Sequence, residues 1–356
     1  MKEVVGIQYL RGLAALSVVI FHALGALRPI DGVEPVWRYA WAGGVDVFFV
    51  ISGFIIWLSA GRSTQRPGQW WLNRLIRIAP LYWLTLLATL AIMALRANGG
   101  SGDLPDLGEI VASFLFIFHV NSQSGEFTPI LVPGWSLNHE FVFYLMVAIS
   151  LFLNKPAARF VLLATMILAL VGLRSVADPT SPLQNRGTSP MQLEFLAGIV
   201  IAILYPWLRA LPWRHVLGVI AVLAAAAALI VLAPRLYADG AGPRTIYFGG
   251  PATMLLFGVV CLEDKLSAHP LALLRTLGDA SYSLYLSHPL VGAIPTMIWK
   301  ALGGESFWLG MVLILGVTVG YAILQYRFIE APMLRVLRNW TAGRTRPATG
   351  RMMETG

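Results

Sequence analysis

Ten stretches of this sequence are long and apolar enough to cross a lipid bilayer as helices. A spanning helix needs about 20 predominantly apolar residues, because the hydrocarbon core is about 30 Å thick and a helix rises about 1.5 Å per residue. Inside the bilayer the backbone amides must be paired within the protein, which restricts such stretches to helices. The expected spans are residues 7–27, 42–60, 78–96, 135–153, 159–176, 192–208, 215–233, 247–262, 281–300 and 307–328. The sequence therefore predicts an all-α polytopic membrane protein with about ten transmembrane helices.

The composition supports a membrane protein and argues against other classes. Hydrophobic residues make up 57% of the chain and charged residues 12%, whereas soluble domains have about 45–50% and about 25%. The net charge of +8 comes from loop arginines, which report topology, so we expect membrane lipids and no nucleic acid as partners. The single cysteine, Cys261, excludes an intramolecular disulfide and a Cys-rich metal site, and no metal is expected.

The distribution of basic residues predicts the orientation of the chain. Residues 109–120 form an eleventh apolar segment that is too short to span, so we expect a re-entrant or interfacial segment there. With ten spans and the N-terminus inside, 18 of the 26 Lys and Arg residues lie on the cytoplasmic side. Because cytoplasmic loops are enriched in Lys and Arg, both termini are predicted to be cytoplasmic. Arg11 lies inside the first apolar stretch, which favours a retained helix over a cleaved signal peptide.

The expected domain organisation is simple. Residues 1–340 form one integral membrane domain, and residues 341–356 form a basic, disordered cytoplasmic tail. No internal repeat is evident, which argues against a transporter built from inverted repeats.

The first span carries two ionisable residues, Arg11 and His22. They are eleven positions apart, so they lie on one helix stripe and roughly 16 Å apart along the axis. Arg11 is expected at the cytoplasmic mouth and His22 near the middle of the membrane. An ionisable group inside a span is a functional candidate by default. In the alternative interpretation Arg11 reaches the headgroups and His22 bonds a neighbouring helix.

Arg74 and Arg77 are three positions apart at the start of the third span, so they lie on one helix face, at the same cytoplasmic surface as Arg11. Guanidinium groups bind phosphate in a bidentate manner, so the pair predicts a phosphate site. Ordinary anchoring by positive loops is the alternative interpretation.

Further polar residues stand at the ends of other spans. Asp46 is at the outer end of the second span, followed by Ser52 and Gly53, whose small size favours close helix packing. His139 and Glu140 begin the fourth span, with Tyr144 one turn below Glu140. His288 precedes a proline in the ninth span, and Glu330 follows the tenth. In the alternative interpretation these residues have structural roles only, as helix caps or as hydrogen-bond partners of a neighbouring backbone.

The order of these motifs resembles the integral-membrane acyltransferase family 3, the O-acyltransferases of bacterial surface polysaccharides and some antibiotics. The opening residues are most similar to the exopolysaccharide acetyltransferase branch. The motifs that carry the resemblance, over about residues 5–338, are Arg11…His22, Ser52-Gly53-Phe54, Arg74-Leu75-Ile76-Arg77, the Trp135–Glu140 element and Glu330-Ala331-Pro332.

The resemblance implies a multi-pass protein of the bacterial inner membrane that moves an acyl group, usually acetyl, from cytoplasmic acyl-CoA to a hydroxyl of a saccharide or lipid-linked glycan. The expected catalytic residues are His22, as base or transient acyl carrier, Glu140 and Asp46. The expected CoA-binding residues are Arg11, Ser52, Arg74, Arg77 and Glu330. The expected acceptor-binding residues are Trp135, His139, Tyr144 and His288. Two alternatives stay open: an acyltransferase for a macrolide or other small molecule, and a flippase for a lipid-linked sugar.

Overall fold

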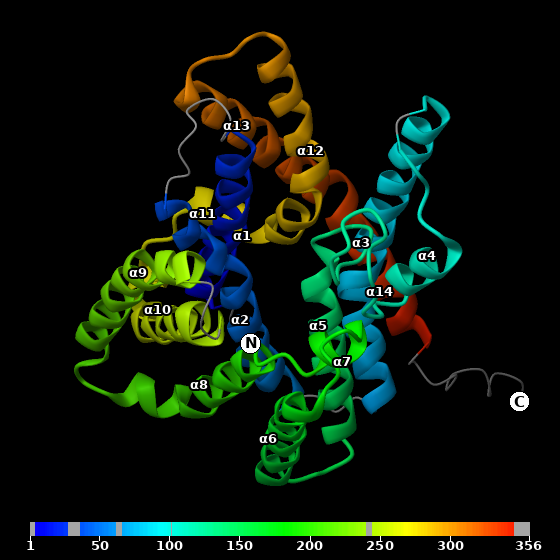
Figure 1. Ribbon diagram of the computed structural model, residues 1–356. Helices are drawn as coiled ribbons and strands as arrows, with labels where there is room; N and C mark the ends of the chain where they lie inside the picture. Colours follow the sequence, from blue (N-terminus) through cyan, green and yellow to red (C-terminus); the bar gives the residue numbers. More distant parts are fainter. Residues whose placement is uncertain (1–3, 28–35, 62–65, 101, 240–243, 345–356) are drawn as a thin grey trace, which may run out of the picture.

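The structure is a computed structural model that describes residues 4–27, 36–61, 66–100, 102–239 and 244–344. These residues form helices and no strand, which confirms the all-α prediction (Figure 1). Each of the ten expected spans coincides with a helix. The ten helices are α1 (Val5–Ala26), α2 (Gly44–Ala60), α3 (Pro67–Asn98), α5 (Gly134–Ser150), α6 (Pro156–Gly172), α8 (Gln192–Ala210), α9 (Arg214–Asp239), α10 (Gly250–Ala268), α12 (Ser281–Ala301) and α13 (Phe307–Gln325).

Eight helical segments within the described residues are long and apolar enough to span a membrane. They contain α1, α2, α3, α6, α8, α9, α10 and α13. The remaining two, α5 and α12, are more polar or shorter: α5 has 17 residues, and α12 carries His288 and two prolines. The chain is thus a multi-pass helical protein.

Shorter elements connect these helices. They are η2 (Val36–Gly43), α4 (Leu107–Phe114), η3 (Leu173–Val176), α7 (Pro182–Gly187), η4 (Thr245–Gly249), α11 (Ala272–Asp279), η5 (Tyr326–Glu330) and α14 (Ala331–Arg344). Helix α4 has eight residues and overlaps the first half of the segment 109–120, which was expected to be re-entrant or interfacial. The Asp106 carboxylate caps α4 by accepting from the Glu109 amide at 2.9 Å, and the helix ends at Phe114. A helix this short cannot cross a bilayer.

Helices α2 and α8 cross with their backbones in contact. A Cβ atom on Gly53 would lie 2.0 Å from the carbonyl oxygen of Phe195, and one on Gly198 would lie 2.0 Å from that of Val50. Only glycine fits at both positions. For Gly53 this agrees with the close helix packing that its small size favoured. The crossing fixes the depth of α2 in the bundle and so the position of Ser52.

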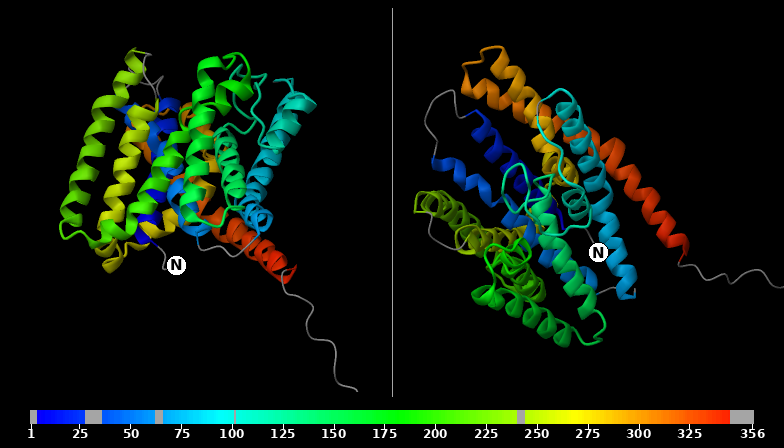
Figure 2. Two further views of the ribbon diagram at one scale, coloured as in Figure 1. Left: turned by 90° about the horizontal axis from the view of Figure 1, so that it is seen from below. Right: turned by 45° about the vertical axis from the view of Figure 1, so that its right-hand side comes forward.

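The start of α1 is tied to the end of α10. The Glu263 carboxylate accepts the backbone amides of Val5 and Gly6, each at 2.8 Å. The first turn of a helix has unpaired amides and a partial positive charge, so a carboxylate satisfies both. The described start of the chain and the end of α14 lie at the same end of the bundle (Figure 2).

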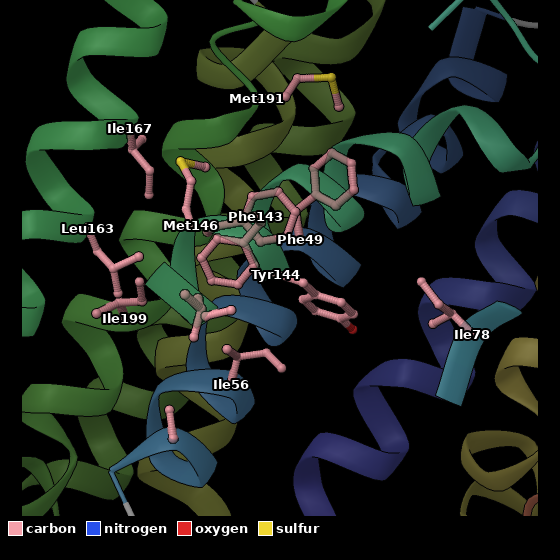
Figure 3. Close-up of a cluster of buried hydrophobic side chains, with 14 of the residues drawn as sticks. Phe49, Ile56, Ile78, Phe143, Tyr144, Met146, Leu163, Ile167, Met191 and Ile199 are labelled. Carbon is pink, nitrogen blue, oxygen red and sulfur yellow. The ribbon is translucent and has the colours of Figure 1, made fainter. Parts of the chain in front are cut away.

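Aromatic packing joins α2, α5 and α8. The Phe143 and Phe195 rings stack with centroids 4.3 Å apart, and Phe49 stacks on Phe195 at 4.7 Å. Tyr144 belongs to the same cluster, but its hydroxyl points out of it, with Ile78 across the gap (Figure 3). Both Tyr144 and Ile78 line a cavity.

The expected tail begins as helix: α14 continues through residues 341–344. Residues 345–356 lie outside the described part of the chain.

Candidate active site

A cavity of about 180 Å³ lies between α1, α2, α3, α5 and α12. We name it the arginine cavity. Its charged and hydroxyl-bearing walls include six residues that the sequence predicted for the site or its donor: Arg11, Ser52, Arg74, Arg77, Glu140 and Tyr144. Four motifs that are far apart in the sequence therefore meet in one space.

The Glu140 carboxylate is held by two hydroxyl groups. Ser52 donates to its Oε1 atom at 2.9 Å, and Tyr144 donates to the same atom at 2.5 Å. Charge-assisted bonds of this kind are short and strong. The helical spacing of Glu140 and Tyr144 (i, i+4) allows their contact, whereas the Ser52 contact depends on the depth of α2.

The two paired arginines have different surroundings. Arg74 donates to the Ser59 hydroxyl at 2.7 Å, and its guanidinium lies 5.3 Å from the Trp70 ring centroid. Arg77 forms an ion pair of 2.7 Å with Glu330, which is 1% exposed. The other Glu330 oxygen accepts from the Ser283 hydroxyl at 2.7 Å. Glu330 thus holds Arg77 in place, and it does not line the arginine cavity itself.

A second cavity, of about 450 Å³, adjoins the first and is named the mouth cavity. Arg11 and Arg77 line both cavities. Asp279 and two arginines of α14, Arg335 and Arg338, line the mouth cavity as well. The sequence placed these two arginines only among the topology charges, although their i, i+3 spacing after Glu330-Ala331-Pro332 was a visible signal.

A third cavity, of about 610 Å³, contains His22 and His288 and is named the histidine cavity. Tyr285 lines both this cavity and the arginine cavity. Its hydroxyl donates to the Pro133 carbonyl at 3.0 Å and lies 2.8 Å from the Ser136 hydroxyl. Shared walls therefore order the three cavities as mouth, arginine and histidine. Arg11 lines the first two and His22 the third, as expected for two ends of one helix stripe.

The two cavity histidines face each other with ring centroids 4.9 Å apart. The Nδ1 atom of His288 lies 2.7 Å from the Tyr285 carbonyl oxygen. A carbonyl only accepts, so Nδ1 carries the proton, and the neutral ring keeps its lone pair on Nε2. That buried Nε2 atom has no partner among the described residues.

Asp46 acts on the histidine cavity through another residue. It is fully buried and accepts two bonds from the Arg244 guanidinium, Oδ2 at 2.6 Å and Oδ1 at 3.2 Å. Arg244 also donates to the Ala42 carbonyl at 2.9 Å and lines the histidine cavity. In the sequence, Arg244 is only one of the basic residues expected on the outer side of the membrane. Asp46 itself lines none of the three cavities, so it holds Arg244 in place.

The expected acceptor residues separate in the structure. Trp135 and His288 line the histidine cavity, whereas Tyr144 lines the arginine cavity. His139 lines none of the three and is buried. Its ring packs against Phe49, Phe118 and Trp135, at centroid distances of 5.9, 5.0 and 6.0 Å. This surrounding is that of a core histidine.

Glu140 was expected at the outer side, in contact with the acceptor or orienting His22. It lies in the arginine cavity with Ser52 and Tyr144, not in the histidine cavity with His22. Its position in the sequence gave only a helix end, while the tilt and depth of α5 decide which cavity it faces. For metal chemistry, no group of three or more His, Cys, Asp and Glu side chains comes together in the part of the chain that the structure describes.

Known proteins resemble this chain over nearly its whole length. The acyltransferase domain family matches residues 4–327. The exopolysaccharide production protein ExoZ of Rhizobium meliloti is 33% identical over 303 residues, which cover 83% of this chain and 90% of that relative. The putative peptidoglycan O-acetyltransferase YrhL of Bacillus subtilis is 27% identical, and the peptidoglycan O-acetyltransferase OatA of Listeria monocytogenes is 26% identical. These two matches cover 93% of this chain but 55% and 56% of the relatives. No solved structure matches the chain.

The family match includes both cavity histidines, the paired arginines and Glu140. The resemblance that the sequence motifs indicated is confirmed. The chain belongs to the acyltransferase 3 family of membrane O-acyltransferases.

Proposed function

We propose that this protein transfers an acyl group, acetyl in the first instance, from cytoplasmic acyl-CoA to a hydroxyl of a saccharide or lipid-linked glycan. One observation carries the proposal: a row of cavities joins a cluster of arginines to a pair of histidines along α1. A donor with a phosphorylated end and a thioester end matches that polarity. The relatives are named for exopolysaccharide production and peptidoglycan O-acetylation, which favours a glycan acceptor.

The donor lies along the row with its phosphates toward the mouth. Arg11 and Arg77 line both the mouth cavity and the arginine cavity, and Arg74 lines the arginine cavity alone. The axial separation of Arg11 and His22 is roughly 16 Å on a helix, which is of the order of the pantetheine arm. The thioester then reaches the wall formed by Tyr285, between the arginine and histidine cavities.

His22 is the group that handles the acceptor proton. It faces the open space of the histidine cavity, where a neutral imidazole accepts a proton from a hydroxyl near neutral pH. The hydroxyl oxygen attacks the thioester carbonyl, the C–S bond breaks, and the proton passes from His22 to the CoA thiolate. In the two-step form, a His22 nitrogen attacks the thioester carbonyl, the C–S bond breaks, and the proton on the other ring nitrogen passes to the CoA thiolate. The acceptor hydroxyl oxygen then attacks the acyl carbon, the acyl–nitrogen bond breaks, and the hydroxyl proton passes to His22.

Glu140 acts on the donor rather than on the acceptor. Its carboxylate, fixed by Ser52 and Tyr144, lines the cavity through which the pantetheine amides pass. An ionised carboxylate accepts the N–H groups of such amides. Trp135 lines the larger histidine cavity and supplies an aromatic face for a sugar ring.

The membrane arrangement is part of the proposal. We place ten spans in a bacterial inner membrane, with both termini and the mouth cavity on the cytoplasmic side. The start of α1 and the end of α14 lie at the same end of the bundle, which supports placing both on one side of the membrane (Figure 2). The excess of Lys and Arg in the loops on that side supports the cytoplasmic assignment.

The test is an assay of CoA thiol release by the purified protein in lipid nanodiscs with acetyl-CoA. Acceptor candidates are neutral oligosaccharides, lipid-linked oligosaccharides and a macrolide, and the product is identified by a mass increase of one acetyl group. Release stimulated by a glycan supports the proposal. Release stimulated only by the macrolide replaces the acceptor, and lipid-linked sugar translocation without CoA release replaces the reaction.

A further inference from the structure

The mouth cavity holds more positive charge than the arginines so far assigned to the donor, Arg11 and Arg77, account for. Four guanidinium groups line it, those of Arg11, Arg77, Arg335 and Arg338, against the single carboxylate of Asp279. Two of the four have side-chain partners: Arg77 pairs with Glu330, and Arg11 donates to the Gln8 amide oxygen at 3.1 Å. The excess therefore centres on α14.

Arg335 and Arg338 have no side-chain hydrogen bond or ion pair to any residue that the structure describes. Both are exposed, so their donors are open to a ligand. Three positions apart on a helix, their Cβ atoms are about 5–6 Å from each other on one face. Leu334 is buried and lines the same cavity, which shows that this part of α14 faces inward.

The start of α14 is fixed by a buried ion pair. Glu330 immediately precedes Ala331, the first residue of α14, and bonds both Arg77 of α3 and Ser283 of α12. Arg335 and Arg338 lie about one and a half and about two turns after Glu330. The distance between them and the arginine cavity is thereby set by rigid helices.

We infer that Arg335 and Arg338 form a subsite at the mouth cavity for a phosphate monoester, the ribose 3′-phosphate of the CoA donor. This inference rests on the proposed acyl-CoA donor and adds where its nucleotide end binds. A monoester dianion complements two unpaired guanidinium groups, which bind it bidentately. The subsite distinguishes CoA from an acyl group carried on pantetheine alone.

A phospholipid headgroup offers similar chemistry, and α14 also exposes Val336 and Trp340, which suit a membrane surface. The geometry points to the donor instead, because Arg335 and Arg338 share a cavity with Arg11 and Arg77, and these two also line the arginine cavity. A headgroup site would not need that continuity.

The experiment compares three donors on the full-length protein in nanodiscs of zwitterionic lipid: acetyl-CoA, acetyl-3′-dephospho-CoA and S-acetylpantetheine. The acetyl-CoA measurements are repeated in nanodiscs that contain anionic lipid. The variants are Arg335→Ala, Arg338→Ala and the double variant, with Arg327→Ala as the matched control. Arg327 is exposed on the same C-terminal segment and lines none of the three cavities. Affinity is measured by calorimetry.

The double variant is expected to weaken acetyl-CoA binding by about tenfold or more, as for loss of charge-assisted bonds. Binding of acetyl-3′-dephospho-CoA should change less than threefold, and Arg327→Ala should bind all three donors as the wild type does. Lysine at both positions should recover part of the loss, since the charge returns without the fork.

Four results overturn the inference, three of them without touching the proposed function. Equal affinity of the double variant and the wild type for acetyl-CoA moves the subsite elsewhere while leaving the proposed function intact. Equal losses for acetyl-CoA and acetyl-3′-dephospho-CoA remove the 3′-phosphate as the ligand. A loss seen only in nanodiscs with anionic lipid assigns the arginines to headgroups. If the wild type binds none of the three donors, the proposed donor fails first and the inference falls with it.

Discussion

The ring of His288 lies 4.9 Å from that of His22, centroid to centroid, and its buried Nε2 atom has no hydrogen-bond partner among the described residues. The Tyr285 carbonyl fixes this tautomer at the other ring nitrogen. Tyr285 also lines the arginine cavity, so one residue forms a wall of that cavity and orients a histidine of the other. A catalytic His22 thus has a neighbour of set tautomer rather than a carboxylate.

His22→Ala is expected to leave acetyl-CoA binding within threefold of the wild type, because no arginine contact is lost. Transfer should fall by about 10²–10⁴, the usual contribution of a general acid–base group. His22→Gln keeps hydrogen-bonding capacity without a titratable base and should be equally inactive. The measurements are calorimetric binding and CoA release with acceptor. Activity restored by glutamine would identify His22 as a structural histidine.

His288→Asn tests the neighbouring ring. The asparagine amide retains a donor for the Tyr285 carbonyl but has no equivalent of the unpaired Nε2 atom. If Nε2 assists His22, transfer falls at least about tenfold, the lower range of acid–base effects, and the shape of the pH–rate profile changes. Thermal stability should stay near that of the wild type. An unchanged pH–rate profile with lowered stability would assign His288 to packing alone.

Removing Arg77 has two effects that a double variant separates. Arg77→Ala leaves Glu330 as a buried carboxylate without its ion partner, which costs about 3–5 kcal/mol of stability. Adding Glu330→Gln removes the orphaned charge and should recover most of that loss. The second effect of Arg77→Ala is weaker acetyl-CoA binding, because a contact to the donor phosphates is lost. This weakening should persist in the double variant, since the contact remains absent. Thermal unfolding and calorimetric binding measure the two effects, and recovered binding would exclude Arg77 from the donor site.

Gly53→Ala and Gly198→Ala are expected to destabilise the α2–α8 crossing, because each new Cβ would lie 2.0 Å from a backbone oxygen. Movement of α2 would displace Ser52 and reduce transfer as well. Gly316→Ala in α13 is the matched control, since a Cβ there meets no atom within 4 Å. It should be neutral or stabilising, by up to about 1 kcal/mol. Thermal unfolding in detergent ranks the three, and equal stabilities would contradict the crossing.

Reporter fusions test the orientation. With ten spans and both ends inside, a reporter after residue 340 is cytoplasmic and one near Asn121 is external. Asn121 lies in the loop between α4 and α5, where a fusion disturbs no spanning helix. A C-terminal reporter found outside the cell would contradict the ten-span arrangement.

The sequence alone determined the helices and their chemistry. Each of the ten apolar stretches became a helix, because in a bilayer the length of an apolar run and the need to pair backbone amides leave no other local structure. Arg11 and His22 were placed on one stripe by helix geometry, and the order of motifs identified the family. The length of the segment 109–120 was also enough to predict that it does not span the membrane.

Only the tertiary structure decided which side chains share a cavity. Helix tilt and depth are set by contacts between helices, such as the Gly53–Gly198 crossing, and hydropathy carries no information on them. Glu140 therefore turned toward the arginines, His139 was buried among aromatic rings, and Asp46 was paired with Arg244. For the same reason Arg335 and Arg338, which in the sequence are tail charges like several others, line a cavity that shares Arg11 and Arg77 with the arginine cavity.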